Sequence, residues 1–75
     1  LKPHSSTFES DNYLHLLSPR ELEVFKLVGK GKNNQEIALL LHLTEGTVKN
    51  YITRILSQLN FRDRVSAALW AQLNL

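Results

Sequence analysis

The sequence predicts an all-α fold, a four-helix bundle-like domain that contains a helix-turn-helix. Three observations predict it. Apolar residues recur at helical spacing in four stretches, each preceded by a helix-capping residue. No stretch shows a convincing strand pattern. Between residues 44 and 59 one side of the expected helix is aliphatic and the opposite side is polar, so one face should be buried and the other free.

Length and composition narrow the classes of protein. The chain has 75 residues, which is enough for one small domain with a modest core. A net charge of +2 permits nucleic-acid binding but does not by itself argue for it. The chain has no cysteine, so disulfides and cysteine-based zinc sites are excluded, and a reducing cytoplasm fits. The longest apolar run, residues 37 to 41, is too short to cross a bilayer, so no membrane association is expected.

Residues 1–12 are rich in polar residues and show no apolar period, which predicts a linker or flexible N-terminal segment before a domain at 13–75. The chain begins at Leu1 rather than Met, and we expect it to be a piece of a longer protein. Four apolar residues at the start of the domain are expected to pack as one short turn: Tyr13, Leu14, Leu16 and Leu17.

The first helix should begin after Ser18, which can cap the amide of Glu21 while Glu21 reaches back to the amide of Ser18. Pro19 suits the first helical position. Gly29 and Gly31 bracket the expected end of this helix. The side chains expected inside are Leu22, Phe25 and Val28, with Leu27 partly inside.

Asn33 or Asn34 should cap the second helix, with Glu36 in reach of a reciprocal bond. Its apolar face is expected to comprise Ile37, Ala38, Leu40 and Leu41. His42 falls in the tight break before the third helix, where a positive φ is expected.

Thr44 should cap the third helix, which runs to about Leu59 and ends at Asn60 in a left-handed conformation. Asp63 should cap the fourth helix, which extends through Leu73. The side chains expected to face the core from that last helix are Val65, Ala68 and Leu69.

The third helix carries the candidate binding surface. At about 100° per residue its aliphatic stripe comprises Val48, Ile52, Ile55 and Leu59, and almost opposite lie Gly46, Asn50, Thr53 and Ser57. Asn50 can pair with an adenine edge, Lys49 can reach a guanine acceptor or a phosphate, and Thr53 can offer a hydroxyl or a methyl group to a base. We therefore predict that this helix, residues 45 to 59, enters the major groove of double-stranded DNA. A solvated surface helix is the plainer alternative, although no acid lies between Gly46 and Leu59.

Residues around this helix are candidates for contact with the DNA backbone. Tyr51 and Arg54 flank the outer face, where phosphates would lie. Two alternatives remain open for a further group, which could bind phosphate or merely cap helices: Asn34, Gln35 and Thr44. Lys30 and Lys32 could form a phosphate-facing loop or could simply be solvated.

Other chemistry is not expected. His4, His15 and His42 have no metal-ligand spacing, so neither a metal nor another cofactor is predicted. No nucleophile and base, or pair of carboxylates, indicates an enzyme or a small-molecule substrate. A structural ion pair between Glu21 and Arg64 is expected from the pattern.

The last helix provides the alternative function, a helical protein–protein interaction module. Trp70 could belong to the core or could be an exposed contact for a second copy. Ala67 and Ala71 share its side of the helix and would let another helix approach, so the three residues are candidates for dimerisation.

Several motifs in combination resemble the LuxR-type helix-turn-helix domain, the output module of the NarL/FixJ response regulators and of quorum-sensing receptors. The resemblance covers roughly residues 17 to 73. It depends on four short matches: Leu17-Ser18-x-Arg20-Glu21, Glu36-Ile37-Ala38, Thr47-Val48-Lys49, and Leu59 with Arg64. Two departures are Tyr51, where the family often has His, and Gln58-Leu59-Asn60, where it often has Lys-Leu-Gly.

The resemblance implies a bacterial transcription regulator that binds specific DNA sequences as a homodimer formed through the last helix. It implies that Lys49, Asn50 and Thr53 face bases, and that Thr47 and its neighbours hold phosphates. It also implies an N-terminal regulatory domain, commonly a phosphorylated receiver, as in two-component systems.

Overall fold

The computed structural model describes residues 13–75, and within this range every regular element is helical. The elements are a short 3-10 helix, η1 (Leu14–Leu16), and four α-helices: α2 (Pro19–Gly29), α3 (Asn34–Leu41), α4 (Glu45–Leu59) and α5 (Arg64–Asn74). The predicted all-α class is therefore confirmed for the described part of the chain. The predicted linker at residues 1–12 lies outside the described residues.

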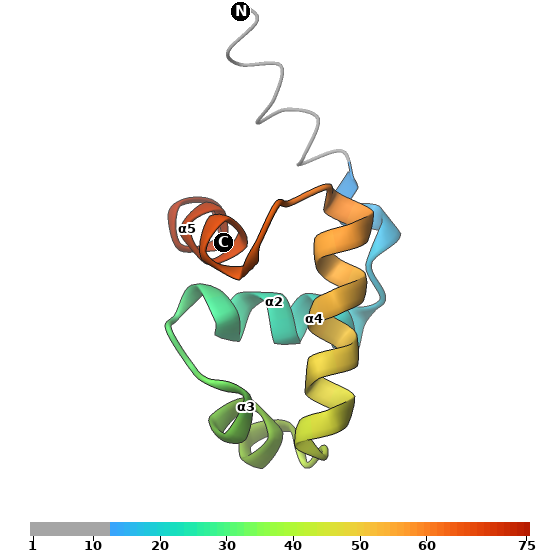
Figure 1. The fold of residues 1–75 in the computed structure, drawn as a ribbon, viewed down its shortest axis with the longest axis vertical. Helices are drawn as coiled ribbons and strands as arrows, with labels where there is room; N and C mark the ends of the chain where they lie inside the picture. Colours follow the sequence, from blue (N-terminus) through green and yellow to red (C-terminus); the bar gives the residue numbers. More distant parts are fainter. Residues whose placement is uncertain (1–12) are drawn as a thin grey trace, which may run out of the picture.

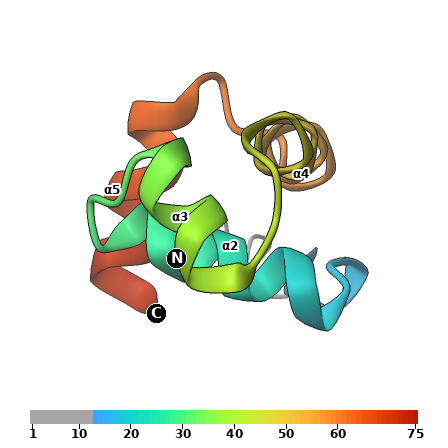
Figure 2. The ribbon, with the colours of Figure 1, turned by 90° about the horizontal axis from the view of Figure 1, so that it is seen from below.

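Helix α2 lies at the centre and packs against α4 and α5, while α3 packs against the first part of α4 (Figure 1). Seen along α4, the helices α2 and α3 lie to one side of it (Figure 2). The largest fully buried side chains come from these contacts: Phe25, Ile37, Ile55, Val24 and Val48. Helix α4 therefore packs against the core through one face only.

Local sequence signals determine where the helices begin. The Ser18 hydroxyl accepts from the Glu21 amide at 3.1 Å, and the Glu21 carboxylate accepts from the Ser18 amide at 2.8 Å. Asn33 and Glu36 form the same reciprocal pair at 2.8 Å in both directions, so Asn33 is the cap of α3. These capping boxes satisfy amides that a helix start would otherwise leave without partners.

The breaks after α3 and α4 have the predicted left-handed residues. His42 has φ 58° and Asn60 has φ 60°. At the first break the Leu43 amide donates to the Ala38 carbonyl at 2.9 Å, which closes the turn of the helix-turn-helix. The angle between α3 and α4 is thereby fixed by backbone geometry as well as by packing.

The face of α5 that meets the core differs from the prediction. Val65 and Leu69 were expected inside, but their exposed fractions are 68% and 55%. Ala67 and Ala71 are buried instead, at 2% each. The reason is the close approach of α2: a Cβ added at Gly29 would lie 2.6 Å from the Cβ of Ala71. Only small side chains fit between the two helices, so the larger ones point outward.

Other predictions for the core need smaller corrections. Leu40 is exposed, whereas Ile37 and Ala38 are buried and Leu41 is partly buried. Leu22 is only partly buried, because α2 turns Val24 inward with Phe25 and Val28. Glu21 occupies a core position on the same stripe, which disguised the apolar period of this helix.

Three aromatic side chains form a cluster where α2 and α5 meet. The rings of Phe25 and Trp70 are parallel, with centroids 5.8 Å apart, and Phe61 packs at an inclined angle against both. Trp70 therefore belongs to the core of its own domain, the first of the two alternatives that the sequence left open.

Candidate DNA-binding face

Helix α4 has two faces of different chemistry. Val48, Ile52, Ile55 and Leu59 are all buried. The opposite side, which we call the outer face of α4, is exposed along its whole length and comprises Gly46, Lys49, Asn50, Thr53 and Ser57. No part of the domain at residues 13–75 covers this face, so side chains with both donors and acceptors are available to a ligand.

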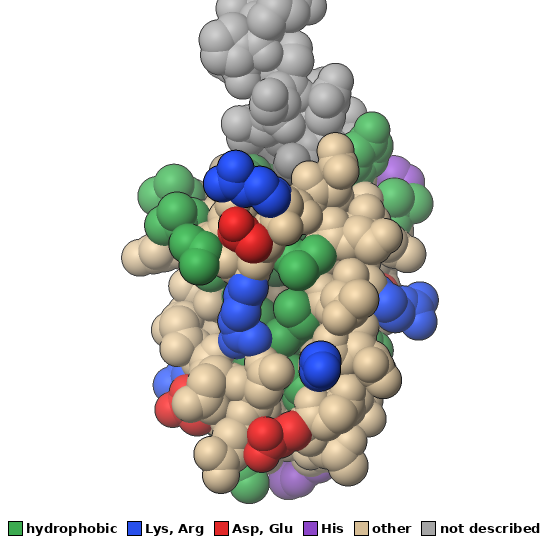
Figure 3. Space-filling view, viewed as in Figure 1, with side chains coloured by type: hydrophobic (Ala, Val, Ile, Leu, Met, Phe, Trp, Pro, Cys, Tyr) green, Lys and Arg blue, Asp and Glu red, His purple; other side chains and the backbone are tan. Residues whose placement is uncertain are grey.

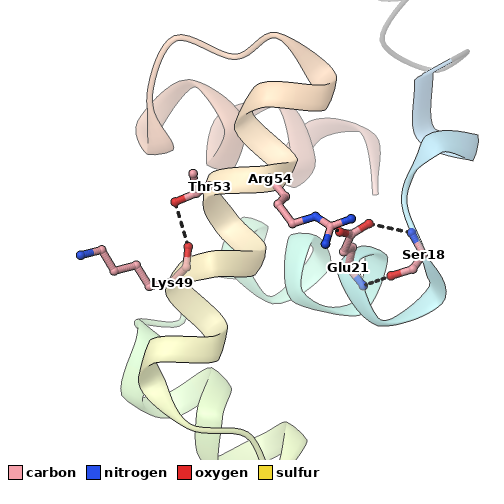
Figure 4. Close-up of polar contacts among 5 residues, drawn as sticks. All are labelled: Ser18, Glu21, Lys49, Thr53 and Arg54. Atoms are coloured by element: carbon pink, nitrogen blue, oxygen red, sulfur yellow. Dashed lines mark hydrogen bonds and ion pairs between the residues drawn. The ribbon is translucent and has the colours of Figure 1, made fainter.

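Polar contacts within α4 limit what the outer face can offer. The Thr53 hydroxyl donates to the Lys49 carbonyl at 3.0 Å (Figure 4). Its hydrogen is thus used inside the helix, and Thr53 retains a methyl group and an acceptor oxygen. A methyl group suits the C5-methyl of thymine, and an acceptor suits the amino group of adenine or cytosine.

Arg54 leaves the α4 helix on a different side from Lys49 and Thr53 and reaches the beginning of α2 (Figure 4). Its Nε lies 3.0 Å from Oε2 of Glu21, whose side chain is only 3% exposed. The predicted pair between Glu21 and Arg64 is therefore wrong. A buried carboxylate without a cation would be costly, so Arg54 has a structural role within the domain.

The beginning of α4 retains hydrogen-bond donors. Thr44 caps the helix by accepting from the Thr47 amide at 3.1 Å, and its hydroxyl donates to the Thr47 hydroxyl oxygen at 2.9 Å. The Thr47 hydroxyl keeps its own hydrogen to donate outward. The amides of the first turn and the positive end of the helix dipole also favour an anion here.

The beginning of α3 is tied to the beginning of α5. The Arg64 guanidinium donates to Oδ1 of Asn34 and, at 2.9 Å, to the carbonyl of Lys32. Gln35 and Lys30 are exposed, and Lys32 is half-buried. In Figure 2 the first turn of α5 lies toward the upper edge of the view, as α4 does.

The charge on this side is sparse and mixed. In Figure 3 the Lys and Arg side chains are separated by uncharged polar surface along α4, while hydrophobic side chains gather over α5. Tyr51 is half-buried and packs against the core beside the outer face. Recognition here would depend on hydrogen bonds placed by helices more than on a dense positive patch.

Neither a metal site nor a membrane span is found in the described residues. No group of three or more His, Cys, Asp and Glu residues in this part of the chain is arranged to hold a metal ion. None of its helices is both long and apolar enough to cross a bilayer.

A comparison with known protein families agrees with this all-α fold. Residues 15–71 match the family described as bacterial regulatory proteins, luxR family. The chain belongs to the LuxR family. The family carries a DNA-binding domain, and this chain is such a domain of a bacterial transcription regulator.

Individual relatives are similar over the same region. The chain is 49% identical to the transcriptional regulatory protein LnrK of Bacillus subtilis (strain 168) over 63 residues, which is 84% of this chain and 29% of LnrK. It is 45% identical over 56 residues to the response regulator protein VraR of Staphylococcus aureus (strain NCTC 8325 / PS 47), 75% of this chain and 27% of VraR. VraR of Staphylococcus epidermidis (strain ATCC 35984 / DSM 28319 / BCRC 17069 / CCUG 31568 / BM 3577 / RP62A) gives the same values. The chain thus spans less than a third of these relatives.

Arg54 and Arg64 have partners that the sequence did not predict. Glu21 was expected to pair with Arg64, and Arg54 was expected to be free for phosphate. Arg54 and Arg64 are ten residues apart in the sequence and lie on different helices. The placement and rotation of α4 and α5 against α2 decide which of them reaches Glu21, and no sequence spacing specifies these to the accuracy of one contact.

Proposed function

We propose that the domain binds a specific DNA sequence by inserting α4 into the major groove, with Lys49, Asn50 and Thr53 facing bases. The observation that carries this proposal is the exposed outer face of α4 opposite a buried aliphatic stripe. Asn50 donates to and accepts from adenine, Thr53 presents its methyl group and oxygen, and Lys49 donates to guanine or to a phosphate.

The proposed backbone contacts come from α4 itself, from the beginning of α3 and from the segment between α2 and α3. Thr47 donates its hydroxyl, and the first amides of α3 and α4 provide further donors. The side chains proposed to lie along the phosphates are Asn34, Gln35, Thr44, Thr47, Tyr51, Lys30 and Lys32. Arg54 can contribute only through the guanidinium nitrogens that Glu21 does not engage.

We further propose that the chain is the output domain of a two-component response regulator that acts in the cytoplasm, with an N-terminal regulatory domain preceding it. The relatives support this, since VraR is a response regulator and most of each relative lies outside the matched segment. Dimerisation through α5 would then use its exposed residues. Ala67, Ala71 and Trp70 face the domain's own core, so Val65, Leu69 and Leu73 replace them in the proposed interface.

The second candidate function, a protein–protein interaction module, is favoured by that same exposed surface of α5. Salt dependence distinguishes the two functions. Binding of DNA should weaken steeply as salt rises, because phosphate contacts release counterions. An apolar helix contact should barely change with salt.

The proposed function is tested by selecting bound sites from a random pool of duplexes with the 75-residue chain. On the selected site, Asn50→Ala should cost about 1–3 kcal/mol, with a much smaller loss on unrelated duplexes. Lys30→Ala is the matched control: it should weaken binding to all duplexes alike and lower the salt slope by about 1. Equal losses on both kinds of duplex for Asn50→Ala would show that this residue does not read a base.

A further inference from the structure

Arg64, the first residue of α5, reaches back about thirty residues along the chain to the beginning of α3. Its guanidinium donates from Nη1 to Oδ1 of Asn34 and from Nη2 to the carbonyl of Lys32, the latter at 2.9 Å. Arg64 is half-buried, whereas most cations of this domain are exposed. A fork of two bonds from one side chain therefore fixes both the loop before α3 and the first side chain of α3.

This contact determines which end of the Asn34 amide meets Arg64. A guanidinium has donors and no acceptor, so the atom that meets it must be the amide oxygen. The NH₂ group of Asn34 then lies on the other branch of the amide. Phosphate oxygens accept hydrogen bonds and donate none, so the NH₂ group is the end that a DNA backbone requires.

We propose that Arg64 is a positioning residue for DNA-backbone binding, which acts by holding Asn34 with its NH₂ group turned toward a phosphate. The inference rests on the proposed function, in which Asn34 contacts the backbone. It also links α5 to the binding face, because the residue that orients Asn34 is the first residue of that helix.

The test is a double-mutant cycle on the selected duplex, with Arg64→Lys, Asn34→Ala and the double variant. Lys keeps the charge but cannot form the fork. Each single variant should weaken binding roughly three- to tenfold, the value of one hydrogen bond. The double variant should be no weaker than Asn34→Ala alone, since Arg64 acts through Asn34. The salt slope of Arg64→Lys should equal that of the wild type, because no charge is lost.

Gln35→Ala provides the matched control. Gln35 is the exposed neighbour of Asn34, and the hydrogen bonds of Arg64 among the described residues go to Asn34 and Lys32 instead. In a variant that carries both Gln35→Ala and Arg64→Lys, the fold-losses of affinity for the selected duplex should multiply. Thermal unfolding of each variant shows whether the domain remains folded.

The side-chain amide of Asn34 provides a second readout by NMR, without DNA. Arg64→Lys should shift the NH₂ signals of Asn34 and leave those of Asn50 in place. Unchanged Asn34 signals would overturn the inference, and so would an Arg64→Lys loss of affinity that persists in full in the Asn34→Ala background. A wild-type chain that binds no duplex even at low salt would instead overturn the proposed function itself.

Discussion

Helices α4 and α5 are both amphipathic, but they bury opposite kinds of side chain. Helix α4 turns its large aliphatic residues inward, and its small and polar residues are exposed. Helix α5 buries Ala67 and Ala71 and leaves Val65, Leu69 and Leu73 largely exposed. The difference teaches that hydrophobicity alone does not decide which face is buried. The distance to the neighbouring helix decides it as well, and α5 lies against α2 at a glycine.

The largest effect should come from the buried stripe of α4. Ile55 is 1% exposed, so Ile55→Ala leaves a cavity in the middle of the core and should lower the free energy of unfolding by about 2–5 kcal/mol. Urea denaturation measures the loss. A loss below about 1 kcal/mol would mean that α4 is held less tightly than its burial indicates.

The close approach of α2 and α5 predicts the next largest effect. A methyl group at Gly29 would lie 2.6 Å from Ala71 Cβ and 3.0 Å from its backbone carbonyl carbon. Gly29→Ala should therefore destabilise the domain by about 1–3 kcal/mol through overpacking.

Gly46→Ala is the matched control for that variant, because the nearest atom to the added methyl group is Thr44 Oγ1 at 4.0 Å. It should stabilise α4 by up to about 1 kcal/mol through helix propensity. Equal changes in melting temperature for the two glycine variants would refute the steric explanation.

The exposed side of α5 should matter little for the stability of the single domain. Leu69→Gln should change the free energy of unfolding by less than about 0.5 kcal/mol, because the side chain is already 55% exposed. The same variant should reduce binding of the second copy to a selected duplex, as measured by the stoichiometry of the complex. A large loss of stability would show that Leu69 packs inside the domain after all.

The two helices also differ in how their caps respond to pH. The amide of Ser66 donates to the Asp63 carboxylate at 2.8 Å, and this bond, with further help from the Ser66 hydroxyl and Arg62, holds the pKa of Asp63 below its usual value of 3.8. The contribution of this cap is complete above the unfolded pKa and is lost as pH falls through the lower folded pKa. The hydroxyl of Thr44, which caps α4, does not titrate.

A comparison of the wild type with Asp63→Asn isolates this effect, because Asn caps equally well and carries no charge. The melting temperature of the wild type should fall more steeply than that of Asp63→Asn between about pH 5 and about pH 2. If the melting temperatures of the two proteins fell in parallel with pH, the assigned role of the Asp63 carboxylate would be wrong. This is the smallest of the four effects, since Asp63 is exposed.

The sequence was sufficient for features that depend on local chemistry. Ser18, Thr44 and Asp63 cap helices as predicted, and Asn33 is the cap of α3 among the two residues that the sequence offered. The left-handed conformation of His42 follows from the short break that it occupies. The two faces of α4 were also predictable, because its large residues lie on a single stripe and the helices that pack against it leave room for them.

Features that depend on the positions of neighbouring helices could not be predicted. The inward face of α5 depends on Gly29, which is about forty residues away in the sequence. The partners of Arg54 and Arg64 depend on how α4 and α5 are rotated. Contacts of Lys49, Asn50 and Thr53 with bases stay predictions, since they depend on a duplex as well as on the domain.

The stacking of Trp70 on Phe25 gives the molecule a built-in optical probe. Trp70 is the single tryptophan of the chain, and its ring packs against Phe25 of α2 and against Phe61. Its fluorescence emission should therefore move to longer wavelength when α5 separates from α2 and water reaches the indole. Intrinsic fluorescence can then follow the opening of this aromatic cluster without any label.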